Sequence, residues 1–453
     1  MGTVNGRNAQ VARAFAGRAL AALLGLSATG LTGATPAAVV THAMAPATMQ
    51  GARYQFATAF QPQGLVRVPC QLAPRDLSHG PFCYGPDQIR AAYDIQPVLD
   101  SGITGAGETI VIIDAFQSPT LVGDLGHFNA AWHLPSAPLN VIAPDGLTPF
   151  DGTNNEQLGW SGEISLDVEW AHAIAPGATI DLVLARDSSD ASLLSVTRYA
   201  VDHNLGDVIS QSFGEAEMCM DPSLQAAQHR LFKRATAKRI SLFAAAGDLG
   251  AAEPNCDRTH LIRSASTPAS DPNVTAVGAT NLQADAVTGA YQSESVWKDA
   301  FGSGAGGGGF STLYARPGYQ AESISRDRRR GLPDVAYDGD PTSGFLVAWS
   351  DLRPGFWIFG GASAGAPQWA GITALADQGR HHRLGLLNPM LYELAGSRQD
   401  TPAFHDIVTG NNSFGGVEGY AAARGWDPAS GLGTPDVARL LSRLAGEPGE
   451  TQG

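Results

Sequence analysis

Short apolar runs alternate with amphipathic segments through the middle of the chain. Residues 86–93 begin with Pro and Asp, as helices often do, and the apolar run 109–113 follows as a buried strand. Further strands are expected at 179–184, 207–212 and 240–245, separated by helices at 192–201 and 223–237. Continuous apolar strands between helices are typical of a parallel sheet that is covered on both faces. The pattern therefore predicts an α/β fold with a parallel sheet flanked by helices.

The N-terminal stretch has the order of a secretory signal. Arg7, Arg13 and Arg18 precede the apolar run 19–26, and small residues follow, with possible cleavage positions near Ala34 and Ala45. An Ala-rich leader is the alternative. The apolar run is too short to span a bilayer. We expect a signal peptide within 1–45 and a secreted, extracellular protein that has no membrane contact once the signal is removed.

Composition changes again after the signal. Residues 46–80 are rich in Ala, Pro and Gln without a lasting period, which indicates a linker or a short pro-segment. The alternating pattern then fills one domain over 81–445, and 446–453 form a tail. Asp and Glu total 43 against 29 Lys and Arg, for a formal charge of −14. Because no basic stripe is present, nucleic acid is excluded as a partner.

Four cysteines allow three pairings, and spacing alone does not choose among them. We favour the nearest-neighbour pairs, Cys70 with Cys83 and Cys219 with Cys256. Neither pair has CxxC or Cys/His ligand spacing, so structural disulfides are favoured over a zinc site. Disulfides suit an exported protein.

A dense glycine cluster lies at 302–309. Such a run can cradle an anion or let a substrate backbone approach closely, and a flexible loop is the simpler interpretation. It lacks the Gly-Lys-Ser/Thr ending of a P-loop, which disfavours a nucleotide site.

Ser363 lies among small residues at 361–367, directly before an apolar helical pattern. It is either a helix N-cap or an exposed nucleophile whose small neighbours let a substrate carbonyl approach. The segment also matches the G-x-S-x-G elbow of α/β-hydrolases, but the acid and His that such an enzyme needs do not follow convincingly.

Two acidic motifs accompany this serine. Glu163 and Asp167 lie four residues apart on one face of a predicted helix. They form either a solvated acidic face or a coupled carboxyl pair that acts as a general base. Asp248 follows the apolar strand end at 245–247, where it is either a turn former or a protonated acid that donates to an oxyanion.

These motifs, taken together and in this order, resemble the sedolisins, serine-carboxyl peptidases with a subtilisin-like fold. The resemblance rests on Glu163-x-x-x-Asp167, on 245–248 and on 360–367, and it runs from about Tyr84 to Leu441. It implies a monomer that cleaves polypeptides, as an endopeptidase or an exopeptidase. It also implies that Ser363 is the nucleophile, Glu163 the general base and then acid, Asp167 its orienting partner and Asp248 the oxyanion donor. Residues 212–214 would resemble the wall that pairs with an extended substrate.

The same resemblance implies a structural calcium site near the C-terminus. Asp406 and Asp427 would supply carboxylates, and Ile407, Ala423 and Gly425 main-chain oxygens, which are the hard ligands that Ca²⁺ prefers. Two loop Asp residues in Asx-turns are the alternative.

The chain departs from the family pattern at several positions. Ala362 stands where Thr is usual, Leu249 where Ser is common and Ala423 where Gly is usual, and little chain is left for a folded propeptide before Tyr84.

A subtilisin with a Ser-His-Asp triad is the nearest rival. Asp114 ends the first strand as the subtilisin acid does, but no His-Gly-Thr segment follows, and His172 points off the Glu163 face. A calcium-stabilised binding module without turnover is the rival from another functional class.

Overall fold

The fold is built around one large, mostly parallel sheet. The structure is a computed structural model that describes residues 53–60, 68–72, 82–299, 302–321, 324–396 and 402–445. Its central sheet has eight strands in the order β13-β12-β8-β6-β3-β5-β4, and β16 pairs with β12. These strands are β3 (Thr109–Ala115), β4 (Leu139–Ile142), β5 (Thr179–Ala185), β6 (Val208–Gln211), β8 (Ser241–Ala245), β12 (Thr275–Ala284), β13 (Tyr291–Val296) and β16 (Val335–Asp338). All pairs are parallel except that of β12 with β13, which confirms the predicted parallel sheet.

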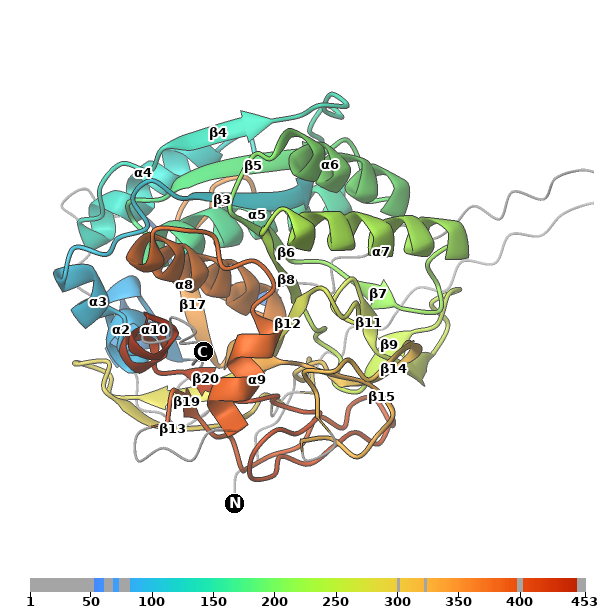
Figure 1. Cartoon of the computed structure of the whole chain (residues 1–453). Helices are drawn as coiled ribbons and strands as arrows, with labels where there is room; N and C mark the ends of the chain where they lie inside the picture. The colour runs from blue at the N-terminus through green and yellow to red at the C-terminus, as the bar shows by residue number, and fades with distance from the viewer. Residues whose placement is uncertain are drawn as a thin grey trace, which may run out of the picture. The chain divides into compact units, whose positions relative to one another are not determined.

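Helices cover both faces of this sheet (Figure 1). On β3, Ile110 and Ile112 enter one hydrophobic cluster, while Val111 and Ile113 enter the other. Helices α5 (Asn155–Ile174) and α8 (Gly365–Arg380) pack on the first face, and α6 (Asp190–His203) and α7 (Pro222–Ala237) on the second. Because successive residues of a strand point to opposite faces, a strand buried on both sides is apolar throughout.

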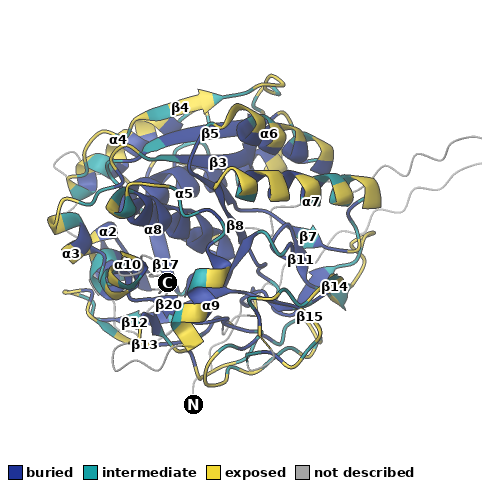
Figure 2. Cartoon of the chain, in the orientation of Figure 1, coloured by how far each residue is buried: buried dark blue, intermediate teal, exposed yellow. Residues whose placement is uncertain are grey.

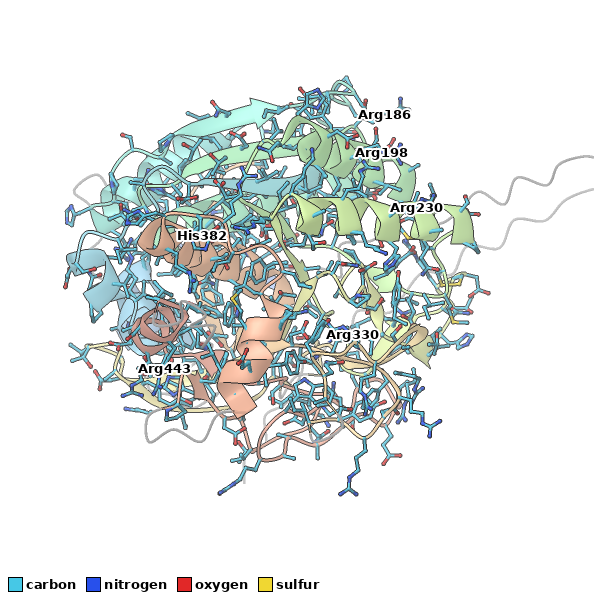
Figure 3. The ribbon with its side chains drawn as sticks, in the orientation of Figure 1. Arg186, Arg198, Arg230, Arg330, His382 and Arg443 are labelled. Atoms are coloured by element: carbon cyan, nitrogen blue, oxygen red, sulfur yellow. A yellow bond between two sulfur atoms is a disulfide. The ribbon has the colours of Figure 1, made fainter. Side chains whose placement is uncertain are left out.

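The two helix layers differ in burial. Helices α6 and α7 expose their outer faces (Figure 2), and Arg198 and Arg230 project from them into solvent (Figure 3). Helix α5 is buried over most of its length, from Leu158 to Ile174. A helix surrounded by protein does not need one apolar stripe, so its polar residues face other elements rather than water. The predicted acidic helix therefore lies in the interior.

A second sheet has the order β1-β18-β17-β2. It contains β1 (Arg53–Thr58), β18 (Phe356–Gly360), β17 (Ser343–Ala348) and β2 (Phe82–Tyr84). Strand β1 runs antiparallel to β18, and β17 pairs antiparallel with β18 and parallel with β2. Within 46–80, expected as linker or pro-segment, the structure thus describes a strand and the short helix α1 (Pro69–Leu72).

Both favoured disulfides are present. Cys70 in α1 bonds to Cys83 in β2, and Cys219 bonds to Cys256. The predicted signal segment 1–45 and tail 446–453 lie outside the described residues. In the described part of the chain, no helix combines the length and apolar character that a membrane crossing requires.

The remaining elements flank these sheets. They are the helices α2 (Pro86–Ala92), α3 (Gln96–Asp100), α4 (Leu121–Trp132), α9 (Asn388–Gly396) and α10 (Val437–Ala445), the turn η2 (Ala362–Ala364), and the strands β7 (Glu215–Ala216), β9 (Ala252–Pro254), β10 (Leu261–Arg263), β11 (Ser266–Thr267), β14 (Gly309–Ala315), β15 (Arg329–Leu332), β19 (Phe404–His405) and β20 (Thr434–Pro435). Arg330 lies beside α9 (Figure 3) and is fully buried. It forms an ion pair with Asp334, whose Oδ1 lies 2.8 Å from Nη1 of Arg330. Asp334 also accepts from the Tyr392 hydroxyl at 2.9 Å, so this buried charge pair is hydrogen-bonded rather than isolated.

Candidate active site

Ser363 lies in the turn that joins strand β18 to helix α8. The strand ends at Gly360, η2 carries Ser363, and α8 begins at Gly365. The residue that precedes α8 as its N-cap is Ala364, and no side chain caps the helix. The serine therefore does not act as an N-cap, and at 5% exposure it is held at a buried turn.

Three carboxyl groups gather near this serine. Glu163 and Asp167 come from α5, and Asp114 comes from the end of β3; all three are fully buried. Among the described residues, none of their oxygens has a hydrogen bond of ordinary geometry. Buried carboxylates without donors are costly, so the cluster favours protons shared between neighbouring carboxyls.

Burial dominates the acidity of this cluster. Loss of hydration raises the pKa of Glu163 and Asp167 well above the usual range, and the nearby charge of Asp114 raises both further. Burial also raises the pKa of Asp114, to about 8. The expected alternative of a solvated acidic face is therefore wrong, because these carboxyls have no contact with water that would keep them ordinary acids.

Smaller effects identify the neighbours of each carboxyl. The Ser363 hydroxyl and the Asp167 carboxyl act on Glu163 as hydrogen-bonding neighbours and lower its pKa, against the larger effect of burial. Ser212 acts in the same way on Asp167, and its hydroxyl also donates to the Ser363 carbonyl at 3.3 Å. These contacts are looser than ordinary hydrogen bonds at the Glu163 and Asp167 oxygens. They nevertheless order the groups as Ser363, Glu163, Asp167 and Ser212.

Asp248 reaches the serine turn from the sheet. It follows β8, and its Oδ1 accepts the Ala362 N–H at 2.7 Å. Gly361 makes this approach possible, because a Cβ on it would lie 2.8 Å from Oδ2 of Asp248. Its φ of +136° is also a conformation that only glycine adopts readily. The Asp248 carboxyl is therefore fixed beside the residue that precedes Ser363.

The glycine cluster supports this aspartate rather than an anion. Ala305 N–H donates to the Asp248 carbonyl at 3.0 Å, and Gly307 N–H donates to the Gly247 carbonyl at 2.7 Å. A Cβ on Gly307 would come within 2.1 Å of the Ala246 carbonyl oxygen. These glycines let two backbone segments of the protein lie in direct contact. Close backbone approach, and not an anion cradle, therefore accounts for them.

The predicted calcium ligands lie in two neighbouring loops. Both Asp406 oxygens accept the Gly425 N–H, at 3.1 and 3.0 Å. Asp427 is buried, and its Oδ1 accepts from Ala429 and Ser430 while its Oδ2 accepts the Ala423 N–H at 2.9 Å. Both carboxylates thus face the loop 423–425.

The chemistry of this donor set suits a hard cation. Within the described residues, no backbone N–H donates to the carbonyls of Ile407, Ala423 or Gly425, and no cluster of three or more His, Cys, Asp or Glu forms a metal site of side chains alone. Oxygen ligands from two carboxylates and main-chain carbonyls fit Ca²⁺. To bind the ion, the Asp427 carboxylate would give up some of the hydrogen bonds that it accepts from backbone N–H groups.

Comparison with known proteins agrees with this geometry. The subtilase family model matches residues 152–389. Kumamolisin of Bacillus sp. strain MN-32 is 34% identical over 385 residues, which cover 82% of this chain and 65% of kumamolisin. Sedolisin of Pseudomonas sp. strain 101 is 32% identical over 376 residues, 80% of this chain and 61% of that protein. The chain belongs to the sedolisin family.

A solved structure supports the same assignment. Pseudomonas sedolisin, a serine-carboxyl proteinase complexed with two molecules of pseudo-iodotyrostatin, matches with a TM-score of 0.71 and 30% identity. The match covers 80% of this chain and 98% of that one. The chain spans less than two thirds of the full length of the curated relatives named above. The subtilisin-like fold that the sequence predicts is confirmed, and it excludes the α/β-hydrolase alternative.

The sequence motifs do not place two residues of this sedolisin-family site, Asp114 and Ser212, beside the Glu163 and Asp167 carboxyls. The sequence motifs offer Asp114 only as the acid of a subtilisin triad. The carboxyl ends of parallel strands meet at one edge of a sheet, however, and this rule places Asp114, at the end of β3, near Ser212, after β6. Ser212 was expected only in a substrate wall. His172 takes no part in the cluster: its Nε2 lies 2.9 Å from the Pro135 carbonyl, and burial lowers its pKa to about 4.

Proposed function

We propose that this protein is a secreted, acid-active serine-carboxyl peptidase that hydrolyses peptide bonds in polypeptides through an acyl-enzyme. One observation carries the proposal: Ser363 adjoins the buried Glu163 carboxyl, which in turn neighbours Asp167, at the turn where Asp248 accepts the Ala362 N–H at 2.7 Å. A nucleophile, a base and an oxyanion partner are therefore all available at one turn.

Glu163 would move the protons of the reaction. As Oγ of Ser363 attacks the substrate carbonyl carbon, Glu163 takes the hydroxyl proton and then gives it to the leaving amine when the C–N bond breaks. A water then attacks the carbonyl carbon of the Ser363 ester while Glu163 takes a proton from that water. Glu163 returns the proton to Oγ of Ser363 as the ester C–O bond breaks and the acid product leaves. Asp167 shares a proton with Glu163 and orients it, as the shared burial of the pair favours.

Asp248 would stabilise the oxyanion. Because Oδ1 accepts the Ala362 N–H, Oδ2 is the oxygen that would carry a proton toward the tetrahedral intermediate. A protonated carboxyl is required for that donation, whereas proton transfer from Ser363 requires an ionised carboxyl in the Glu163 pair. Activity is therefore expected to be confined to acid, with a lower limit set by full protonation of the cluster.

Calcium would stabilise the C-terminal loops without entering the reaction. Asp406 and Asp427, with the carbonyls of Ile407, Ala423 and Gly425, would hold Ca²⁺ and join the loops near 406 and 425. The two disulfides and the predicted signal support an extracellular protein, and the monomer is what the family resemblance implies.

The proposal is tested by hydrolysis of a denatured protein by the purified chain from about pH 3 to about pH 8, with calcium present. Acid-limited cleavage is expected, with a loss of at least about 10³-fold in Ser363→Ala and in Glu163→Gln. Gly126→Ala, in an open position of helix α4, is the matched control. Equal cleavage by Ser363→Ala would reject the proposed nucleophile. No cleavage by a folded wild-type chain at any pH would favour the binding module.

A further inference from the structure

Strand β1 lies along the outer edge of the strand that leads into Ser363. Arg53 pairs with Gly360 and Tyr54 with Phe359, in antiparallel register. Strand β17 occupies the opposite edge of β18. Only Gly361 and Ala362 separate the last paired residue of β18 from the serine. Strand β1 therefore reaches to within two residues of the nucleophile turn.

Aromatic side chains hold β1 in this position. The Tyr54 ring meets Trp349 edge-on at 4.9 Å between centroids, and the Phe56 ring meets Trp357 in the same way at 5.1 Å. The Arg353 guanidinium lies over the Phe56 ring at 3.7 Å. These contacts attach β1 through its side chains as well as through its backbone, because each contact buries apolar area and fixes the geometry of a ring.

An occupied edge limits what else can bind there. Extended peptides commonly bind by adding a strand to an exposed sheet edge, where unpaired N–H and C=O groups are available. With β17 and β1 in place, both edges of β18 are already paired from Phe359 to Phe356, and β1 also pairs with Gly360. At about 3.3 Å per residue, the stretch from Gly360 to Ser363 leaves room for roughly two extended residues.

The other half of a bound peptide has a different support. Residues 212–214 follow β6, which belongs to the eight-stranded sheet, and the Ser212 hydroxyl contacts the Ser363 carbonyl. Strand β1 pairs with β18 alone in the described structure. Strand β1 therefore restricts the β18 side of Ser363, and it does not pair with β6, the strand that leads to 212–214.

We propose that β1 remains in the mature enzyme and sets its specificity by occupying the β18 edge. Peptides that extend more than about two residues past the scissile bond on that side are cleaved slowly, so the enzyme acts near one end of its substrates. This inference rests on the proposed peptidase function.

The test uses two peptide ladders that share the residues around one scissile bond. One ladder is lengthened toward the N-terminus and the other toward the C-terminus, and kcat/KM is measured for each length relative to the shortest member of its ladder. For wild type, this ratio is expected to fall about tenfold or more past the second added residue, in one ladder only. Taking a ratio within each protein removes any difference in the folded fraction.

Variants in β1 identify the cause of that fall. Tyr54→Ala combined with Phe56→Ala removes the aromatic contacts and is expected to abolish the length dependence. Tyr54→Phe keeps the ring and is expected to retain it. Gln55→Ala, which changes an exposed side chain between the two aromatic residues, is the matched control and keeps the wild-type ratios.

Three results would overturn the proposal while leaving Ser363-dependent hydrolysis intact. They are wild-type ratios that do not depend on length in either ladder, a double variant with the wild-type fall, and a mature N-terminus beyond Thr58 by protein sequencing. Failure to hydrolyse any peptide, with the chain folded, would instead reject the underlying peptidase function together with this inference.

Discussion

Gly361→Ala tests how Asp248 is held at the serine turn. At φ +136° and ψ 160°, Gly361 occupies a region that is essentially restricted to glycine, and forcing an alanine into it costs about 1–3 kcal/mol. The new Cβ would also lie 2.8 Å from Asp248 Oδ2, well inside van der Waals contact. The backbone or the carboxyl must therefore move, and the 2.7 Å bond from Ala362 N–H is the contact most directly affected.

The catalytic effect should exceed the effect on stability. Loss of one oxyanion donor typically lowers kcat by about 10²–10³-fold, whereas about 1–3 kcal/mol of strain lowers Tm by only a few degrees in a domain of this size. We expect kcat for a short chromogenic peptide to fall at least about 100-fold with little change in KM. Gly126→Ala, a helical site with open space, is the control for the substitution itself.

A double-variant cycle distinguishes the mechanism from general damage. If Gly361→Ala acts by displacing Asp248, then adding it to Asp248→Ala should cost little further activity. Additive losses, or a Gly361→Ala enzyme with wild-type kcat, would refute the argument that Gly361 exists to admit the Asp248 carboxyl.

Three further predictions concern stability. Burial raises the folded-state pKa of Asp377 to about 8, above an unfolded value near 4, so its stabilising effect is complete below about pH 4 and is lost as pH rises toward 8. Urea unfolding should therefore show lower stability at about pH 8 than at about pH 4, with a smaller difference in Asp377→Asn; an equal difference contradicts this assignment. Chelation of calcium should lower the Tm of wild type but not of Asp406→Ala. A wild-type Tm that is the same with and without chelator would reject the calcium site. Replacing Cys219 and Cys256 by Ser opens a loop of 37 residues and should cost about 4 kcal/mol in the free energy of unfolding, measured with urea; a change below about 1 kcal/mol contradicts the estimate.

The sequence alone was sufficient for the local elements and for the order of the motifs. The predicted bounds of strand β3 and helix α7 lie within two residues of the observed bounds. This agreement is possible because apolar periodicity depends only on residues that are close in sequence. Motif order also identified Ser363, Glu163, Asp167 and Asp248 as candidates, and the structure brings them to one turn.

Tertiary structure decided the properties of those candidates. The spacing of Glu163 and Asp167 fits a solvated helix face as well as a buried pair, and only the packing of α5 beneath the sheet removes their water and raises their pKa. The same holds for Asp114, which joins the pair from a strand about 50 residues away.

Long-range pairing was the other property that local patterns could not supply. The glycine cluster looks flexible in sequence, yet it is required where two backbones touch at Gly307. Strand β1 looks like linker because a short strand at a sheet edge needs little periodicity, and its partner, β18, lies some 300 residues later. Sequence neighbours determine which element forms, whereas burial, proton sharing and strand partners depend on residues that meet only after the chain has folded.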